Sequence, residues 1–94
     1  MKEALPASLR PRLRPGCLLQ PLATGWALRH RVASRTVVLD DAGHAALAWL
    51  DGQQTVEDLV FFWCREHQTI DVEPFLRLLT ELWEAGLLDP ETPG

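Results

Sequence analysis

The chain contains few side chains that could act as catalytic nucleophiles. Its 94 residues include no tyrosine, two cysteines and two serines, of which Ser8 lies in a proline-rich stretch and Ser34 in an expected turn. No Gly-X-Ser-X-Gly motif, phosphate-binding glycine loop or His-Glu-X-X-His motif is present. Cys64 has His67 three positions later, but it lies near the apolar face of its expected helix, where cysteine behaves as a small hydrophobe. We therefore expect no enzymatic activity.

Long hydrophobic runs are also missing. The longest span six residues each, 45–50 and 59–64, whereas a membrane-spanning helix needs about 20. Residues 1–16 contain no apolar run before their arginines, so we expect no secretory signal. Without export, Cys17 and Cys64 indicate a reducing compartment rather than a disulfide framework. We expect a cytoplasmic protein with no membrane partner.

Metal ligands are few and poorly spaced. Cys17, His44, Cys64 and His67 include no Cys-X-X-Cys or His-X-X-X-His pair, and only Cys64 and His67 have helical ligand spacing. His67 is better explained as a residue near a helix C-terminus, where positive charge is favoured. We expect neither a metal ion nor a cofactor.

Basic residues are scarce in the second half of the chain. Residues 40–94 hold two basic residues against twelve acidic ones, a net charge of −10, whereas residues 1–39 hold seven against one, a net charge of +6. Such a split points to partners of matching charge. The last expected helix, which would enter the groove in a winged-helix DNA-binding protein, has a net charge of −3 over residues 71–84. Because phosphate contacts dominate nucleic-acid affinity, we expect no nucleic-acid partner.

Three short strands are expected first. Residues 17–21 are mostly apolar, residues 26–31 alternate between two faces, and residues 35–39 are rich in β-branched side chains. Short strands that follow one another most simply form an antiparallel meander. The last of them, residues 35–39, would then be an edge strand.

Helical patterns begin at Asp40. The expected helices span residues 41–50, 56–67 and 72–85. Expected capping residues are Asp40 or Asp41, Thr55 with Asp58 as a capping box, Asp71, and Gly86 at the final C-terminus. The pattern predicts an α+β fold of order βββααα, with residues 1–15 a flexible Pro/Arg arm, 16–89 a single domain and 90–94 a frayed tail.

The second and third helices each have an apolar stripe at a period of 3.6 residues. The stripes comprise Val56, Leu59, Val60, Trp63 and His67, and Val72, Phe75, Leu76, Leu79, Leu82 and Trp83. Leu78 and Phe62 lie off these stripes, and Phe61 lies at the margin of its stripe. Two interpretations stay open for these three side chains: harmless exposure on a small domain, or a binding surface.

An edge strand has its own consequence. Its outward N–H and C=O groups can accept an extended peptide as a further strand. The alternative is that the N-terminal arm or a second copy of the chain covers this edge.

Several strings occur in a characteristic order. They are Leu13-Arg14-Pro15-Gly16, Leu39-Asp40 before a helix of small residues, Leu50-Asp51-Gly52 followed by Thr55-Val56-Glu57, and Glu84-Ala85-Gly86-Leu87-Leu88. In this order, over about residues 9–89, the chain resembles the PqqD family of leader-peptide recognition elements. These act in the biosynthesis of ribosomally made, post-translationally modified peptides. The chain departs from the family at His30-Arg31-Val32, where many members have a Pro-Glu pair.

The resemblance implies a winged-helix-like fold without catalysis of its own. It implies that the leader of a precursor peptide adds antiparallel to the third strand, in a groove walled by the third helix. Mapped onto this chain, the peptide-binding residues are Arg35, Thr36, Val37, Val38 and Leu39 of the strand, and Pro74, Leu78, Leu82 and Ala85 of the helix.

The family implies a second partner, a peptide-modifying enzyme that is often a radical SAM enzyme. Phe61 and Phe62 are our candidates for that contact, and Arg29 and Arg31 with Arg35 are candidates for steering an acidic leader segment. Dimeric forms occur in the family, so we expect a monomer or a strand-mediated homodimer. The competing hypothesis is a winged-helix DNA-binding or self-associating regulator.

Overall fold

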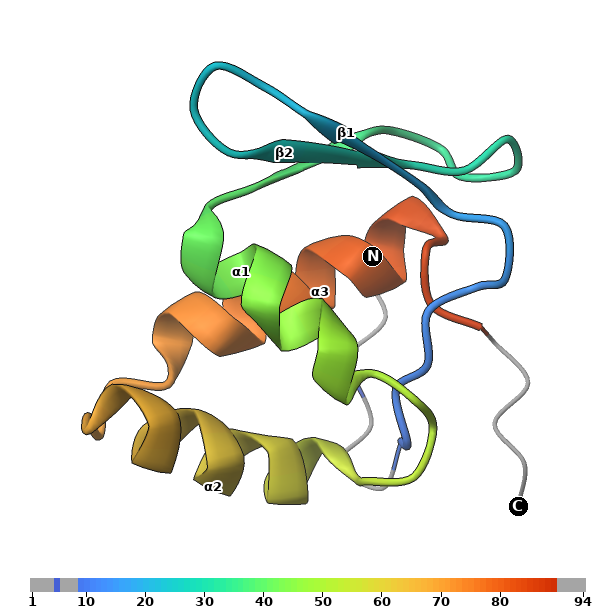
Figure 1. The fold of residues 1–94 in the computed structure, drawn as a ribbon. Helices are drawn as coiled ribbons and strands as arrows, with labels where there is room; N and C mark the ends of the chain where they lie inside the picture. The colour runs from blue at the N-terminus through green and yellow to red at the C-terminus, as the bar shows by residue number, and fades with distance from the viewer. Residues whose placement is uncertain (1–4, 6–8, 90–94) are drawn as a thin grey trace.

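A three-stranded antiparallel sheet is followed by the helices of the chain, so the predicted βββααα order is confirmed (Figure 1). The structure is a computed structural model, and it describes residue 5 and residues 9–89. The elements are β1 (Leu18–Pro21), β2 (Trp26–Arg29), β3 (Val37–Leu39), α1 (Asp41–Ala46), the 3₁₀ helix η1 (Leu47–Trp49), α2 (Val56–His67) and α3 (Glu73–Ala85). The predicted frayed tail, residues 90–94, lies outside the described residues.

The strands follow the chain order β1-β2-β3 across the sheet. Leu28 lies opposite Val37, and Trp26 lies opposite Leu39, so these four side chains share one face. Leu28, Val37 and Leu39 are buried there. Arg35 and Thr36, which we expected within the third strand, precede it in the loop.

Helix ends follow the capping chemistry of the sequence in most places. A carboxylate oxygen of Asp40 accepts a hydrogen bond from Gly43 N–H at 2.7 Å, and Thr55 forms the predicted capping box with Asp58. Gly86 ends α3 in the left-handed conformation, with φ of 83°. The N-cap of α3 is Val72 rather than Asp71, although Asp71 still accepts a hydrogen bond from Glu73 N–H at 3.2 Å.

The first helix is shorter than predicted. α1 ends at Ala46, and the chain continues through η1 to Leu50 in place of a regular helix. Leu50 is buried and Leu47 half-buried. The tighter turn thus carries the chain to a buried leucine and into the loop before α2.

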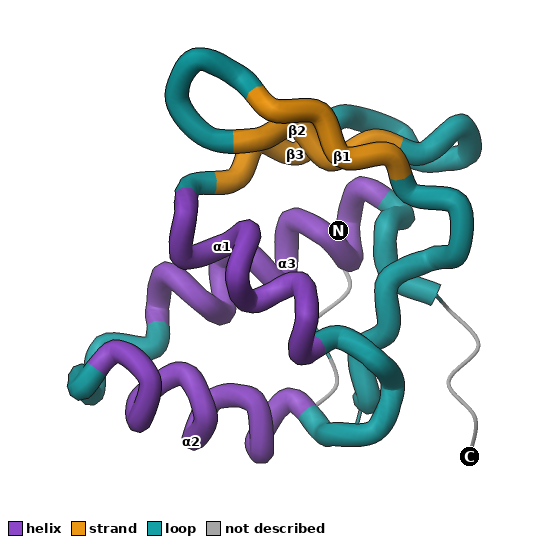
Figure 2. The backbone as a smooth tube through the Cα atoms, viewed as in Figure 1, coloured by secondary structure: helices purple, strands orange, loops and turns teal. Residues whose placement is uncertain are grey.

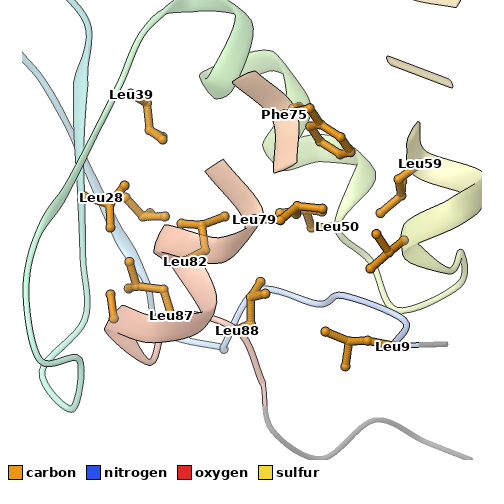
Figure 3. Packing of buried hydrophobic residues seen from close by; sticks show 14 of the residues in the cluster. Leu9, Leu28, Leu39, Leu50, Leu59, Phe75, Leu79, Leu82, Leu87 and Leu88 are labelled. Carbon is orange, nitrogen blue, oxygen red and sulfur yellow. The ribbon is translucent and has the colours of Figure 1, made fainter. Parts of the chain in front are cut away.

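The core lies between the sheet and the helices, with α3 beneath the sheet (Figures 1 and 3). One face of α3 is completely buried: Phe75, Leu79, Leu82 and Ala85 each have no exposed area. The Phe75 ring stacks on Trp63 of α2 with centroids 5.2 Å apart. Leu76, which we placed on the buried stripe, is 37% exposed.

The expected flexible arm is wrong for residues 9–14, which are packed into the fold. Leu9 is 7% exposed in the core, and Val56 N–H donates to its carbonyl oxygen at 3.0 Å. Leu13 forms an isolated antiparallel bridge with Leu88. Backbone hydrogen bonds place this extended segment between the loop before α2 and the last described residues, and Figure 2 draws the segment as a loop. The domain therefore begins at least as early as Leu9.

We expect Leu9→Ala to lower the free energy of unfolding by about 2–5 kcal/mol, because it leaves a cavity in the core. The neighbouring change Arg10→Ala is the control. It removes one exposed hydrogen bond, to the Gln53 carbonyl, and should cost at most about 1 kcal/mol. Chemical denaturation followed by circular dichroism measures both. Equal stability of Leu9→Ala and the native chain would mean that the segment is a loose arm after all.

Candidate functional site

Strand β3 forms one edge of the sheet and presents a single exposed side chain. Val37 and Leu39 are 2% and 3% exposed, whereas Val38 between them is 63% exposed. Because side chains alternate along a strand, Val38 points away from the core.

The hydrogen-bond register of the sheet can be read from the β1–β2 hairpin. Leu22 N–H donates to the Gly25 carbonyl at 2.9 Å, which makes these two residues a bonded pair. The next pair, Pro21 and Trp26, is then a non-bonded pair, in agreement with the missing N–H of proline. Since bonded and non-bonded pairs alternate, Trp26 turns its N–H and C=O toward β3.

The same alternation fixes the backbone of β3. Trp26 lies opposite Leu39, and Val38 lies opposite Ala27. Val37 and Leu39 therefore pair with β2, while the N–H and C=O of Val38 point outward from the sheet. An added strand would find its main-chain partners at Val38.

The opposite edge of the sheet is less suited to pairing. On β1, the outward positions are Leu19 and Pro21, and proline lacks an N–H to donate. The packed N-terminal segment does not cover β3 either, because Arg12 and Leu13 pair with Asp51 and Leu88. Within the described residues, β3 thus keeps an open edge.

A groove of about 840 Å³ borders this edge. Helix α3 supplies one wall, from residues spaced three and four apart on one helical face. The lining residues are Ala23, Thr24, Gly25, Val38, Leu39, Asp40, Asp41, Gly43, Trp63, Pro74, Arg77, Leu78 and Glu81.

The β1–β2 turn, residues 23–25, also lines the groove. Gly25 has φ of 98°, and a Cβ atom there would come within 2.2 Å of the Leu39 carbonyl oxygen. Only glycine fits both the backbone conformation and this approach. Glycine thus allows the turn to lie directly against the C-terminal end of β3.

The structure brings together four of the predicted peptide-binding residues. Val38 and Leu39 of β3 face the same groove as Pro74 and Leu78 of α3. Leu78 is half-buried and packs against the core, so its exposed part lines the groove.

Two predicted wall residues are wrong. Leu82 and Ala85 have no exposed area, because they belong to the face of α3 that packs beneath the sheet. Arg77 and Glu81 line the groove instead. Sequence analysis missed them, although they continue the helical spacing set by Pro74.

The groove is acidic. Its ionisable residues are Asp40, Asp41, Glu81 and Arg77. Arg77 also forms an ion pair with Glu73, one turn earlier, at 3.1 Å. A positively charged group in the groove would meet a surplus of carboxylates.

A second, smaller pocket of about 370 Å³ lies at the other end of β3 and is basic. Its lining residues are Leu18, Arg29, His30, Arg31, Ala33, Arg35 and Thr36. It contains the three arginines that we predicted as steering residues. Arg35 lies 3.7 Å from a carboxylate oxygen of Glu84, and its side chain remains 51% exposed.

His30 fixes the loop that carries two of these arginines, Arg31 and Arg35, whereas Arg29 ends β2. Its Nδ1 accepts a hydrogen bond from Val32 N–H at 3.1 Å, so its Nε2 carries the proton and donates to the Pro15 carbonyl at 2.8 Å. The other end of the loop is held by Ser34, whose N–H donates to the Ala85 carbonyl at 2.7 Å. The pocket is therefore built on a supported loop.

The two candidate enzyme-contact residues differ in environment. Phe61 is 66% exposed and stays available. Phe62 is half-buried, and its ring packs edge-on against Trp49 with centroids 4.5 Å apart. Phe62 is thus part of the aromatic packing between η1 and α2 rather than a free surface residue.

Among the described residues, no three His, Cys, Asp or Glu side chains gather where they could hold a metal ion. Burial raises the pKa of the Cys17 thiol above its ordinary value, and Arg14 offsets this rise only in part. A raised pKa keeps a thiol protonated and weakly nucleophilic. No helix within residues 9–89 is both long and apolar enough to cross a bilayer.

Comparison of this chain with family models, curated proteins and solved structures found no match.

The register predicts opposite effects for proline at two neighbouring positions. Val37→Pro removes an N–H that pairs with β2, so we expect a loss of at least about 2 kcal/mol in the free energy of unfolding. Val38→Pro removes an N–H that points outward and should cost less than half as much. Denaturation curves of the two variants test this. A larger loss for Val38→Pro would reverse the inferred register.

Proposed function

We propose that this protein is a non-catalytic binding module that captures an extended peptide segment as an added strand on β3. The observation that carries the proposal is the open edge at Val38 beside a groove walled by Leu78 and Pro74. A peptide strand there pairs with the backbone of Val38, and its alternate side chains enter the groove.

Magnitudes indicate where the affinity comes from. β3 has three residues, and its outward N–H and C=O belong to Val38. Each such hydrogen bond contributes only about 0.5–1.5 kcal/mol net. One apolar side chain that is fully buried contributes about 1.5–3 kcal/mol. Contacts within the groove therefore supply most of the binding free energy, and the strand edge supplies direction and register.

The class of peptide follows from the resemblance to the PqqD family. We infer that the ligand is the leader segment of a ribosomally synthesised precursor peptide, presented to a modifying enzyme, such as a radical SAM enzyme. The exposed Phe61 is the remaining candidate for the enzyme contact. Its place on α2, outside the lining of the groove, would let peptide and enzyme bind together.

The competing DNA-binding hypothesis has less support. Helix α3 carries Glu73, Glu81 and Glu84 against the single base Arg77, and it packs beneath the sheet with its apolar face. A helix of this charge is repelled by phosphate. Self-association through β3 is a real competitor for the same edge, so binding experiments must include the oligomeric state.

Leu78→Asp is the central test. We expect it to weaken binding of a labelled synthetic leader peptide by at least about tenfold. The aspartate would place an unpaired charge against an apolar peptide side chain, and about 1.4 kcal/mol corresponds to that factor. Fluorescence anisotropy measures the affinity.

Leu76→Asp is the matched control, because Leu76 lies on the same helix but outside the groove lining. It should bind as the native chain does, while Leu79→Asp, at a fully buried position, should unfold the domain. A leader peptide that binds Leu78→Asp normally would place the peptide elsewhere. A concentration-dependent dimer that Val38→Pro abolishes, with no peptide binding, would favour self-association.

A further inference from the structure

The two ends of β3 border pockets of opposite charge, and the basic pocket extends across the end of the sheet to Arg29 of β2 and Leu18 of β1. The groove at the Leu39 end is lined by three carboxylates, those of Asp40, Asp41 and Glu81, and by one guanidinium group. The pocket before Val37 is lined by three guanidinium groups and no carboxylate.

Neighbouring charges reduce this contrast only in part. In the acidic groove, the one arginine forms an ion pair with Glu73, which itself lies outside the groove lining. In the basic pocket, Arg35 lies near Glu84, whereas no ion pair is found within the described residues for Arg29 and Arg31, both exposed. The contrast between the two ends therefore persists in the folded chain.

The two pockets follow one another along the same stretch of chain. Arg35 and Thr36 line the basic pocket, and residues 38–41 line the acidic groove. Seven residues, 35–41, span at most about 23 Å at about 3.3 Å per residue. A peptide of about the same length, paired with β3, would extend from the acidic groove to Arg35 and Thr36 at the near side of the basic pocket.

We propose that this edge selects a charge-polarised peptide, with basic residues toward its N-terminal side and acidic residues toward its C-terminal side. This inference rests on the proposed function. β3 runs from Val37 to Leu39, so an antiparallel peptide has its N-terminal part beside Asp41 and Glu81 and its C-terminal part beside Arg29, Arg31 and Arg35.

The same charges set the direction of the added strand. In the parallel direction, the peptide's basic residues would lie against the arginines and its acidic residues against the carboxylates. Apolar contacts in the groove distinguish poorly between the two directions, because they are not directional. Like charges brought together disfavour the wrong arrangement, which is how surface charge provides specificity.

The test is a selection from displayed random peptides of about twelve residues, longer than the edge and both pockets. We expect the enriched peptides to carry Lys or Arg on the N-terminal side of an apolar stretch and Asp or Glu on its C-terminal side. A synthetic copy of one enriched peptide, and a second with its charges exchanged end for end, then serve as probes of identical composition. The exchanged peptide should bind about fivefold or more weakly.

Asp41→Lys combined with Glu81→Lys removes the charge difference between the acidic groove and the basic pocket. It should weaken binding of the selected peptide by about fivefold or more, and the loss should shrink at about 1 M salt, where the screening length is about 3 Å. Glu57→Lys combined with Glu66→Lys is the control, since it makes the same change of charge at exposed positions of α2 outside both pockets. The control should bind within about twofold of the native chain.

The results distinguish two claims: that a peptide adds as a strand to β3, and that charge selects the peptide and its direction. Peptides that need the edge, so that Val38→Pro weakens their binding, but show no charge order or the opposite one, would overturn the polarity and leave the proposed function standing. A selection that yields no peptide sensitive to Val38→Pro would overturn strand addition itself, and the polarity with it.

Discussion

Burial of one face of α3 beneath the sheet is the constraint on which the rest of the structure depends. Four residues of this face have no exposed area: Phe75, Leu79, Leu82 and Ala85. They belong to a core that extends from Leu28 of the sheet to Leu59 of α2 (Figure 3). Once these side chains are buried, the rotation of α3 about its axis is set. The adjacent face, which carries Leu78 and Glu81, then necessarily borders the edge of β3. The groove is a consequence of how the core packs.

The N-terminal segment supports this arrangement from the other side. Residues 9–14 form an extended segment tied by backbone hydrogen bonds to the loop before α2 and to residues 87–89. Because backbone groups of this segment are already hydrogen-bonded there, they are not available to pair with the open edge of β3. A module that receives a foreign strand needs one edge left free and the rest of its backbone satisfied, because unpaired edges invite non-specific association. The segment contributes to the second requirement without occupying β3.

The brevity of β3 makes charge more important at this site than it would be beside a long strand. Few main-chain hydrogen bonds are available to the proposed added strand, so its register and direction would have to come from side chains. The acidic groove and the basic pocket lie on opposite sides of Val38 and can provide both. The net charges of +6 on residues 1–39 and −10 on residues 40–94 are thus reflected at the site. β3 ends where the two halves of the sequence meet, and it also lies between the basic pocket and the acidic groove.

Local features of this protein follow from the sequence alone. The order of strands and helices, the Thr55–Asp58 capping box and the left-handed end of α3 at Gly86 are set by neighbouring residues, through periodicity and capping chemistry. The edge position of β3 was also predictable, because a meander has two edges. The helical period placed Leu78 off the buried stripe, whereas its place beside β3 was implied only by the resemblance to the PqqD family.

Contacts between distant residues decided everything else. A helical period shows which side chains share a face but not which neighbour that face meets, so Leu82 and Ala85 went into the core while Arg77 and Glu81 came to the groove. Phe62 was withdrawn from the surface by Trp49, a residue on another element. Leu9 is buried in the core and accepts a hydrogen bond from Val56, more than forty residues later in the chain. The local sequence around Leu9 contains no pattern that predicts this contact. Such contacts depend on which surfaces the whole chain can bury together, and only the tertiary structure expresses that choice.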